Sequence, residues 1–311
     1  MSDMQKWKYR PYSVNIETVQ GCNRRCEFCG TMGMEKTLHF VELGTVQHTL
    51  RLLKEAKFKG SIRLAAHGEP TLHPHICDIV RMIRFRLPEV AINLFTNGTV
   101  IEKKPELVDR LFRAGLNNLI VDEYSDHLVG EFIINDPTCR KYRIEREGKG
   151  VELISKDPKA KRICIVPPID GDKNSMKRQL CNQCGAALPP LKKPLSKRCS
   201  VVFRELTIRH DGNVAICCND FRGYYRVGNI LDCHSLEQIW FHKRFEAARR
   251  ILFQSDRSFF PCDVCDVLPN RPGLLPSMGK KVPMEPPTPE DYEIVRERTE
   301  PLAVIEKREW E

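Results

Sequence analysis

The sequence of 311 residues predicts an α/β protein, with a partial (β/α) barrel followed by a smaller domain built on a β-hairpin and a helix. Short β-branched apolar runs alternate with segments of helical periodicity, which predicts the barrel. Each run ends in a polar stretch that contains glycine or an acidic residue. Two alternating runs around Asp211-Gly212-Asn213 predict the hairpin.

The elements of the first part follow one another as strand, helix and strand. The expected strands cover 13–19, 62–66, 90–95, 118–121 and 161–166, and the expected helices cover 43–58, 74–86 and 105–114. This order implies right-handed crossovers and a parallel sheet. Too few residues precede position 199 for eight strands, so we expect the barrel to be open. Residues 126–160 contain many charges and give only weak strand signals.

The C-terminal third has a different pattern. Residues 204–217 form the expected hairpin, and residues 235–251 place apolar side chains on one side of an expected helix. We therefore expect a partial barrel over 1–170, a basic insertion or linker over 171–198, a cysteine-bearing domain over 199–270, and a Pro-rich acidic tail over 271–311. The composition of the tail favours an extended or loosely held segment.

The net charge of +9 is unevenly distributed. Residues 173–198 contain seven Lys or Arg and no acidic residue, whereas residues 282–311 contain nine acidic and four basic residues. A basic body is typical of proteins that bind phosphates or nucleic acids, although a solvated surface explains the same charge.

Neither a membrane span nor a signal peptide is evident in the sequence, and this bears on the cellular compartment. No run approaches the roughly 18 apolar residues of a membrane span, and the N-terminal segment has no apolar signal-peptide core. The sequence thus predicts a cytoplasmic protein without a membrane partner. In a reducing compartment, its 14 cysteines favour metal ligation over disulfides.

Cys22, Cys26 and Cys29 form a Cys-x3-Cys-x2-Cys motif on one loop after the first strand. Three thiolates can hold three corners of a four-iron cluster and leave the fourth iron open. A structural cluster or zinc site normally closes all four positions, and the nearest further ligand here is His39, ten residues on. An open iron implies a ligand that arrives from outside.

The motif resembles the signature of the radical S-adenosylmethionine (radical SAM) superfamily. The resemblance implies that SAM binds the open iron and is cleaved reductively to a 5′-deoxyadenosyl radical. It also implies a set of SAM-binding residues, with Phe28 beside the adenine, Glu69 at the amino group and Glu123 at the ribose hydroxyls. The full set is Phe28, Gly68, Glu69, Thr96, Asn97 and Glu123. His67 stands where the family's Gly-Gly-Glu-Pro motif begins with glycine. No catalytic residue is identified.

A second set of cysteines follows, at Cys199, Cys217, Cys262 and Cys265. Four thiolates can close around one four-iron cluster or one tetrahedral zinc ion. The spacing resembles the SPASM/Twitch extension of radical SAM enzymes, which implies a Twitch domain with one auxiliary 4Fe-4S cluster. Cys218 adjoins Cys217 on the opposite face of the strand, so only one of the two serves as a ligand.

Cys181 and Cys184 form a further Cys-x2-Cys pair. No matching pair of partners is evident for a metal site. We interpret the two residues as loop thiols, and a redox dithiol is the alternative.

Over about residues 14–266 the layout is similar to the 2-deoxy-scyllo-inosamine dehydrogenase-like Twitch enzymes, which oxidise a secondary alcohol. The resemblance implies an oxidoreductase with two 4Fe-4S clusters, SAM, a polar substrate and an external flavodoxin- or ferredoxin-like electron donor. An alternative is radical SAM modification or isomerisation of a nucleotide or nucleic-acid base. The basic segment favours that alternative, with Lys192, Lys193, Lys197 and Arg198 as candidate contacts to an anionic substrate. Peptide maturation and a non-enzymatic, nucleic-acid-binding metal module are further alternatives.

Overall fold

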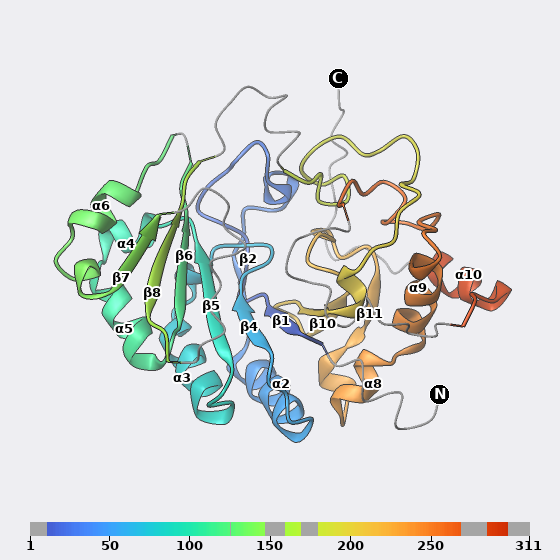
Figure 1. Ribbon diagram of the computed structural model, residues 1–311, viewed down its shortest axis with the longest axis horizontal. Coiled ribbons are helices and arrows are strands. Elements are labelled where there is room, and N and C mark those ends of the chain that lie inside the picture. Colours follow the sequence, from blue (N-terminus) through green and yellow to red (C-terminus); the bar gives the residue numbers. More distant parts are fainter. Residues whose placement is uncertain (1–10, 125, 147–158, 169–179, 269–284, 298–311) are drawn as a thin grey trace.

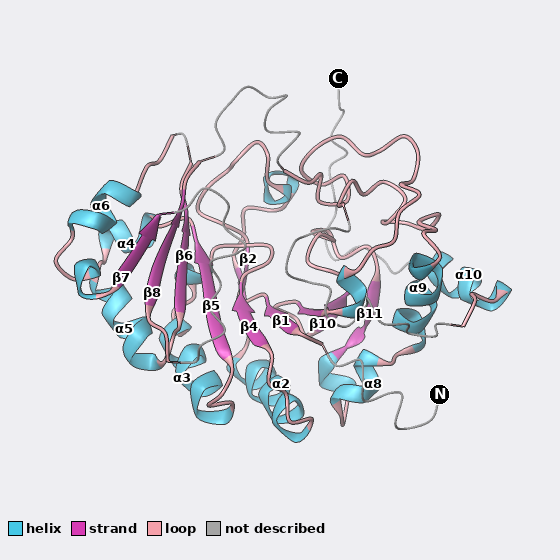
Figure 2. Ribbon diagram, in the orientation of Figure 1, coloured by secondary structure: helices cyan, strands magenta, loops and turns pink. Residues whose placement is uncertain are grey.

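A computed structural model describes residues 11–124, 126–146, 159–168, 180–268 and 285–297. Its centre is one nine-stranded sheet with the strand order β11-β10-β9-β1-β4-β5-β6-β8-β7 (Figures 1 and 2). The strands are β1 Ser13–Ile16, β4 Ser61–Leu64, β5 Ala91–Thr96, β6 Asn118–Asp122, β7 Arg143–Arg146, β8 Arg162–Val166, β9 Glu205–Ile208, β10 Asn213–Ala215 and β11 Arg226–Asn229. A separate antiparallel pair consists of β2 Val19–Gln20 and β3 His39–Phe40. The helices are α2 Leu43–Glu55, α3 Ile76–Arg86, α4 Thr99–Lys103, α5 Glu106–Ala114, α6 Gly130–Asn135, α8 Leu236–Trp240, α9 Lys243–Phe253 and α10 Pro289–Arg296.

The N-terminal strands β1, β4, β5, β6 and β8 pair in parallel, which confirms the α/β prediction. Helices α2, α3 and α5 cover the outer side of the curved sheet (Figure 1). On α5 the buried side chains include Leu107, Val108 and Leu111, which recur at helical spacing. In such a sheet all strands point the same way, so the loops at their carboxyl ends gather at one edge.

The C-terminal strands extend the same sheet. Strand β9 pairs in parallel with β1, and β10 and β11 add antiparallel strands beyond it. The hairpin turns at Gly212, whose φ of 82° is a left-handed conformation that favours glycine. The regions expected at 1–170 and 199–270 therefore share one continuous sheet.

The structure also adds elements that the sequence analysis did not predict. Strand β7 pairs in parallel with β8 at the sheet edge, although it precedes β8 in the chain. Its sequence, Arg-Ile-Glu-Arg, carries one apolar residue and gave no clear signal. The single helix expected over 235–251 is two helices, because the His242 side chain accepts a hydrogen bond from Arg244 N and begins α9 anew.

Part of the tail is ordered, which corrects the expectation of a loosely held segment for residues 289–296. Helix α10 packs on α9, where Arg250 forms an ion pair with Asp291 at 2.5 Å and Tyr292 donates to Asp256 at 2.9 Å. Val295 is buried in the core. The remainder of the predicted tail, like Ser125 and the basic residues Lys173, Lys177 and Arg178, lies outside the described residues. Within the described part of the chain, none of the helices has the length and apolarity to cross a membrane.

Candidate functional site

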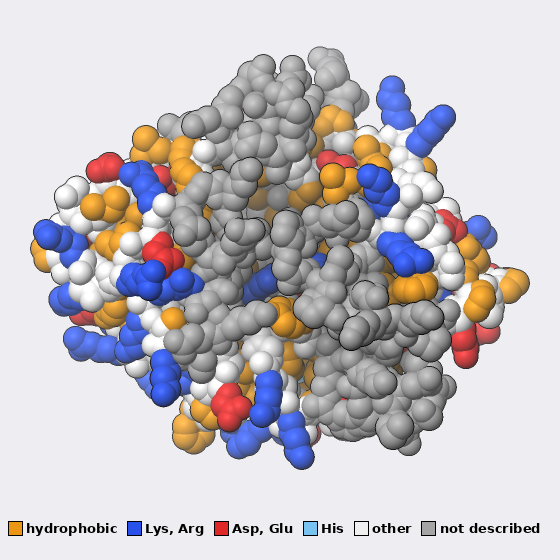
Figure 3. Space-filling view, in the orientation of Figure 1, with side chains coloured by type: hydrophobic (Ala, Val, Ile, Leu, Met, Phe, Trp, Pro, Cys, Tyr) orange, Lys and Arg blue, Asp and Glu red, His pale blue; other side chains and the backbone are white. Residues whose placement is uncertain are grey.

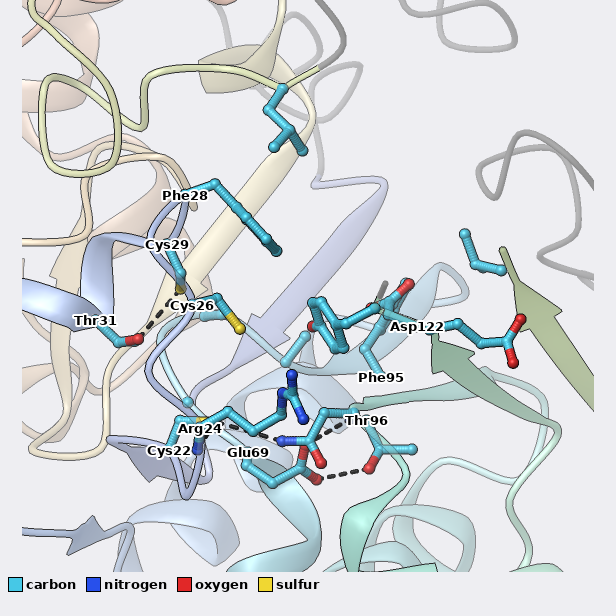
Figure 4. A pocket seen from close by; sticks show the side chains of 18 of the residues that line it. Cys22, Arg24, Cys26, Phe28, Cys29, Thr31, Glu69, Phe95, Thr96 and Asp122 are labelled. Atoms are coloured by element: carbon cyan, nitrogen blue, oxygen red, sulfur yellow. Dashed lines mark hydrogen bonds between the residues drawn. The ribbon is translucent and has the colours of Figure 1, made fainter. Parts of the chain in front are cut away.

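A cavity of about 370 Å³ opens at the carboxyl ends of the parallel strands, a size typical of small-molecule sites. The three cysteines of the first motif lie on one side, and Phe95 and Asp122 lie on the other (Figure 4). The structure brings all the predicted SAM-binding residues to this cavity, namely Phe28, Gly68, Glu69, Thr96, Asn97 and Glu123. Residues from four separate loops thus meet at one site.

The cysteine thiols are surrounded by hydrogen-bond donors. Cys22 Sγ accepts from Arg24 N and from Asn97 Nδ2, both at 3.4 Å, and Cys29 Sγ accepts from Thr31 Oγ1 at 3.2 Å. Burial nevertheless raises the pKa of Cys22 to about 11. A metal must therefore displace a proton to bind there, and the donors then stabilise the thiolate. Three half-buried thiols with such donors fit an iron–sulfur cluster held on three corners.

Glu69 is buried beside the cysteines and accepts four hydrogen bonds. Its Oε1 accepts from Thr71 N at 3.0 Å, from Thr71 Oγ1 and from Thr96 Oγ1 at 2.7 Å, while Oε2 accepts from Asn97 N at 2.8 Å. Burial raises the pKa of Glu69, and these donors oppose the rise. Because Oε2 accepts only one of the four bonds, it keeps a lone pair that can accept from an ammonium group.

His67, where the family motif has glycine, has a structural role. Its ring is buried, with Nδ1 at 2.7 Å from Glu17 Oε1 and Nε2 at 3.2 Å from the Cys218 carbonyl oxygen. It thereby joins β4 to the C-terminal hairpin. The next residue does require glycine, because a Cβ on Gly68 would lie 2.1 Å from the Val19 carbonyl oxygen.

The far wall of the cavity carries two carboxylates. Glu123 accepts from Gly130 N at 2.7 Å and from Arg146 Nη2 at 3.1 Å, so its charge is already paired. Asp122, which the sequence analysis missed, ends β6 and lines the cavity. Burial, followed by the nearby charge of Glu69, raises the pKa of Asp122 to about 7. Its position at a strand end, adjacent to the Glu123 that was singled out, is the signal that could have found it.

Phe28 stacks on Tyr124, with ring centroids 5.8 Å apart, and the Arg24 guanidinium lies 4.7 Å above the Tyr124 ring. These three side chains line the same cavity. They form an aromatic wall next to the thiols, where a planar ring can stack.

The second set of cysteines also gathers. Cys199, Cys217, Cys262 and Cys265 are buried, and burial together with the other three thiols raises the pKa of Cys262. Cys218 points elsewhere, with its thiol 3.7 Å from Glu205 Oε2. Within the described residues, no three His, Cys, Asp or Glu side chains are spaced to enclose a single metal ion. Four buried thiols suit a four-iron cluster and a tetrahedral zinc ion alike.

Cys184 lies in a turn, in keeping with the interpretation as a loop thiol, but this turn packs beside the second set of cysteines, which the sequence analysis did not predict. It is buried against Cys265 and interacts with the thiols of Cys217 and Cys265. Cys181 is partly buried, packs against the same cluster, and donates to Asn219 Oδ1 at 3.2 Å. Five buried thiols therefore gather at the second site, where the sequence analysis placed four, and Cys181 adjoins them.

The four basic residues singled out at 192–198 are exposed and do not line the cavity. Arg198 lies 4.4 Å above the ring of Phe253, the last residue of α9. On the face shown in Figure 3, the visible Lys and Arg side chains are scattered over both sides of the molecule rather than gathered in one patch. A substrate contact from Lys192, Lys193, Lys197 or Arg198 stays a prediction.

Residues 16–157 match the model of the radical SAM superfamily, and residues 199–266 match that of the SPASM iron–sulfur cluster-binding domain. The first match includes the three-cysteine loop and the second all four predicted auxiliary ligands. The chain belongs to the radical SAM superfamily. This is a superfamily of enzymes with a SAM-binding four-iron cluster, so the non-enzymatic alternative is set aside.

A solved structure and several curated proteins are also similar to this chain. The crystal structure of BtrN in complex with AdoMet and 2-DOIA has a similar fold, with a TM-score of 0.64 and 20% identity over 83% of this chain and 94% of that one. The GTP 3′,8-cyclase of Nostoc sp. is 25% identical over 165 residues, which are 50% of this chain and 48% of the relative. Molybdenum cofactor biosynthesis protein 1 of Drosophila melanogaster is 35% identical over 109 residues, or 34% of this chain and 18% of the relative. The chain thus spans about half or less of the length of these curated relatives.

Replacing Glu69 is expected to weaken SAM binding in this radical SAM protein. Glu69→Ala removes a buried carboxylate that can accept from the amino group of SAM, and a charge-assisted hydrogen bond contributes about 1.5–3 kcal/mol. We expect roughly a ten- to hundred-fold rise in the dissociation constant, measured by calorimetry on cluster-loaded protein. Glu69→Gln keeps the shape, and Glu89→Ala, at an exposed residue that pairs with Lys59, is the matched control. Unchanged affinity in both Glu69 variants would move the contact elsewhere.

The raised pKa of Asp122 predicts a pH-dependent stability. Between its unfolded value near 3.8 and its folded value of about 7, the folded protein holds a proton that the unfolded chain has lost. Stability due to this group therefore falls as the pH rises through that window. Asp122→Asn should stabilise the iron-free protein at pH 8 by on the order of 2 kcal/mol and leave stability at pH 4 unchanged. Parallel curves of melting temperature against pH for parent and variant would contradict the assignment.

Proposed function

We propose that the protein is a radical SAM enzyme that cleaves SAM reductively and abstracts hydrogen from a polar substrate, with dehydrogenase-type chemistry assisted by one auxiliary 4Fe-4S cluster. One observation supports it most. The same cavity is lined by Cys22, Cys26 and Cys29 and by the buried carboxylate of Glu69. Thiolates for a three-cornered cluster and an acceptor for the SAM amino group thus lie side by side.

Different residues of the cavity would bind the cluster, the methionine half of SAM and the adenine. Cys22, Cys26 and Cys29 would hold the first cluster, and Glu69, with Thr96 and Asn97 fixing its carboxylate, would orient the methionine half of SAM. When bound, cluster and SAM supply a 5′-deoxyadenosyl radical. Phe28, Tyr124 and Arg24 offer a wall for the adenine, and Leu180, Gln183 and Phe221 close the side toward the second set of cysteines. A substrate between these walls would be shielded from water.

The second set of thiols supports the dehydrogenase hypothesis. A substrate radical that becomes a ketone must lose an electron and a proton. An auxiliary cluster held by Cys199, Cys217, Cys262 and Cys265 would supply an electron acceptor, and Asp122 lines the cavity as a carboxylate that can take a proton. The BtrN-like fold is in keeping with this chemistry, and a flavodoxin- or ferredoxin-like protein would be the donor for SAM cleavage.

A nucleotide substrate is the second candidate, because the curated relatives include GTP 3′,8-cyclases. Arg24 is the cation that lines the described cavity. The described cations of the basic segment, Lys192, Lys193, Lys197 and Arg198, do not line the cavity, so a phosphate-bearing substrate would have to extend from the cavity toward them.

One assay separates the two candidates. Anaerobic, reduced protein with SAM should form 5′-deoxyadenosine slowly on its own, and the true substrate should accelerate it about ten-fold or more. We expect 2-deoxy-scyllo-inosamine or a similar aminocyclitol to accelerate it and to yield a ketone, with deuterium from the carbinol carbon transferred to 5′-deoxyadenosine. Acceleration by GTP alone would favour the nucleotide candidate. Absence of 5′-deoxyadenosine from protein with a full complement of iron would contradict both.

A further inference from the structure

Cys184 lies in the second site although neither family match includes it. It is 4% exposed, it packs with Cys265 and Val267, and its thiol interacts with those of Cys217 and Cys265. The match to the cluster-binding domain begins only at residue 199. The ligand pattern of that domain therefore does not account for Cys184.

The turn that carries Cys184 is braced against the turn that carries Cys262 and Cys265. Asn182, which is 1% exposed, donates from its backbone N to Asp266 Oδ1 at 2.7 Å and from Nδ2 to the Val264 carbonyl oxygen at 2.7 Å. Asp266 N donates back to Asn182 Oδ1 at 3.3 Å. These hydrogen bonds, between Asn182 and residues up to 84 positions later in the sequence, thus fix the two Cys-x2-Cys turns face to face.

The backbone of the turn holds Cys184 in an uncommon conformation. Gln183 and Cys184 have φ values of 49° and 56°, in the left-handed region that non-glycine residues rarely adopt. Gln183 Oε1 accepts from Gly30 N at 2.7 Å, on the first cysteine loop. Adjacent residues therefore reach two different sites, Gln183 the SAM-binding loop and Cys184 the auxiliary thiols.

We propose that Cys184 is a ligand of the auxiliary cluster, interchangeable with the Cys217 or Cys265 thiolate that it adjoins. A four-iron cluster takes four thiolates, and five buried thiols are present. In the exchange, Cys184 loses its proton and forms an iron–sulfur bond. The bond from iron to Cys217 or Cys265 breaks, the released thiolate takes up a proton, and no electrons move. The inference rests on the auxiliary cluster of the proposed function.

The test uses the full chain with Cys22, Cys26 and Cys29 replaced by Ala, so that only the auxiliary site can hold iron. In this background we compare Cys184→Ala, Cys217→Ala and Cys265→Ala, each alone, with the doubles that combine Cys184→Ala with either of the others. Cys181→Ala, alone and with Cys265→Ala, is the matched control from the same turn. Cys184→Ser keeps the volume in case alanine impairs folding. The readouts are iron and sulfide per chain, the electron paramagnetic resonance spectrum after reduction, and circular dichroism.

Cys217→Ala or Cys265→Ala alone should retain about four irons, and adding Cys184→Ala should remove them, whereas adding Cys181→Ala should not. Loss of iron from folded Cys184→Ala or Cys184→Ser alone would also support ligation. The inference is overturned if Cys184→Ala keeps all its iron while each single Cys217 and Cys265 variant loses as much as the matching double. If the background variant, with only Cys22, Cys26 and Cys29 replaced, holds no iron, the auxiliary cluster of the proposed function is contradicted, and this inference fails with it.

Discussion

Replacing Cys22, Cys26 and Cys29 together by alanine is expected to abolish SAM cleavage. The three thiols line the cavity with Glu69, and none of the other described residues that line it offers a soft ligand for iron. Reconstituted protein should fall from about eight irons per chain to about four, which would reside in the auxiliary cluster. Iron analysis and chromatographic measurement of 5′-deoxyadenosine check the two parts of the prediction.

The matched control removes three buried thiols that lie elsewhere, by Cys77→Ala, Cys139→Ala and Cys233→Ala. We expect this variant to be less stable but to keep about eight irons and its SAM cleavage. Equal iron loss in both variants would mean that destabilisation, not ligation, explains the result. If the variant without Cys22, Cys26 and Cys29 still cleaved SAM at the parent rate, these three residues would not be the ligands of the SAM-binding cluster.

Replacing Cys199, Cys217, Cys262 and Cys265 together by alanine is expected to separate two activities. The first cluster should remain, with about four irons, because its thiols lie on a different loop. Slow formation of 5′-deoxyadenosine without substrate should persist. Oxidation of a substrate to a ketone should be lost, because the electron released by the substrate radical has no acceptor. Product analysis under single-turnover conditions measures this separation.

A more conservative variant, Cys218→Ala, serves as the control, because the Cys218 thiol lies 3.7 Å from Glu205 Oε2 and was not assigned as a ligand. It should keep about eight irons and its full turnover. If the quadruple variant keeps eight irons, the four cysteines are not the ligands. If it keeps four irons and still forms the ketone at the parent rate, the auxiliary cluster is not the electron acceptor.

The parallel sheet and the first site could be predicted because their signals are local. Runs such as Ala91–Thr96 are short and apolar, and the residues that follow them reach one edge by topology alone. Cys22, Cys26 and Cys29 fall within a single loop, so their spacing is visible without a structure. The predicted SAM-binding residues reached one cavity for the same reason.

The features that escaped prediction depend on distant contacts. The position of Cys184 is set by Asn182, whose partners Val264 and Asp266 are 82 and 84 residues away. The glycine that follows Cys184 was a local sign of a tight turn, but it does not say which turn lies opposite. Helix α10 was hidden by its prolines, and its order comes from the ion pair between Asp291 and Arg250 and from the burial of Val295 on α9.

The parallel pairing of β1 with β9 has a consequence for how the protein is made. Asn15 and Thr207 are partners in register, yet 192 residues separate them. A ribosome adds about 5–20 residues per second, so β1 waits roughly 10–40 s for its second neighbour. During that time a strand that includes Val14 and Ile16, both buried in the finished fold, exposes an unpaired edge. A chain that stops before β9 would keep that edge permanently, so we expect such truncated products to aggregate rather than to fold as a shorter barrel.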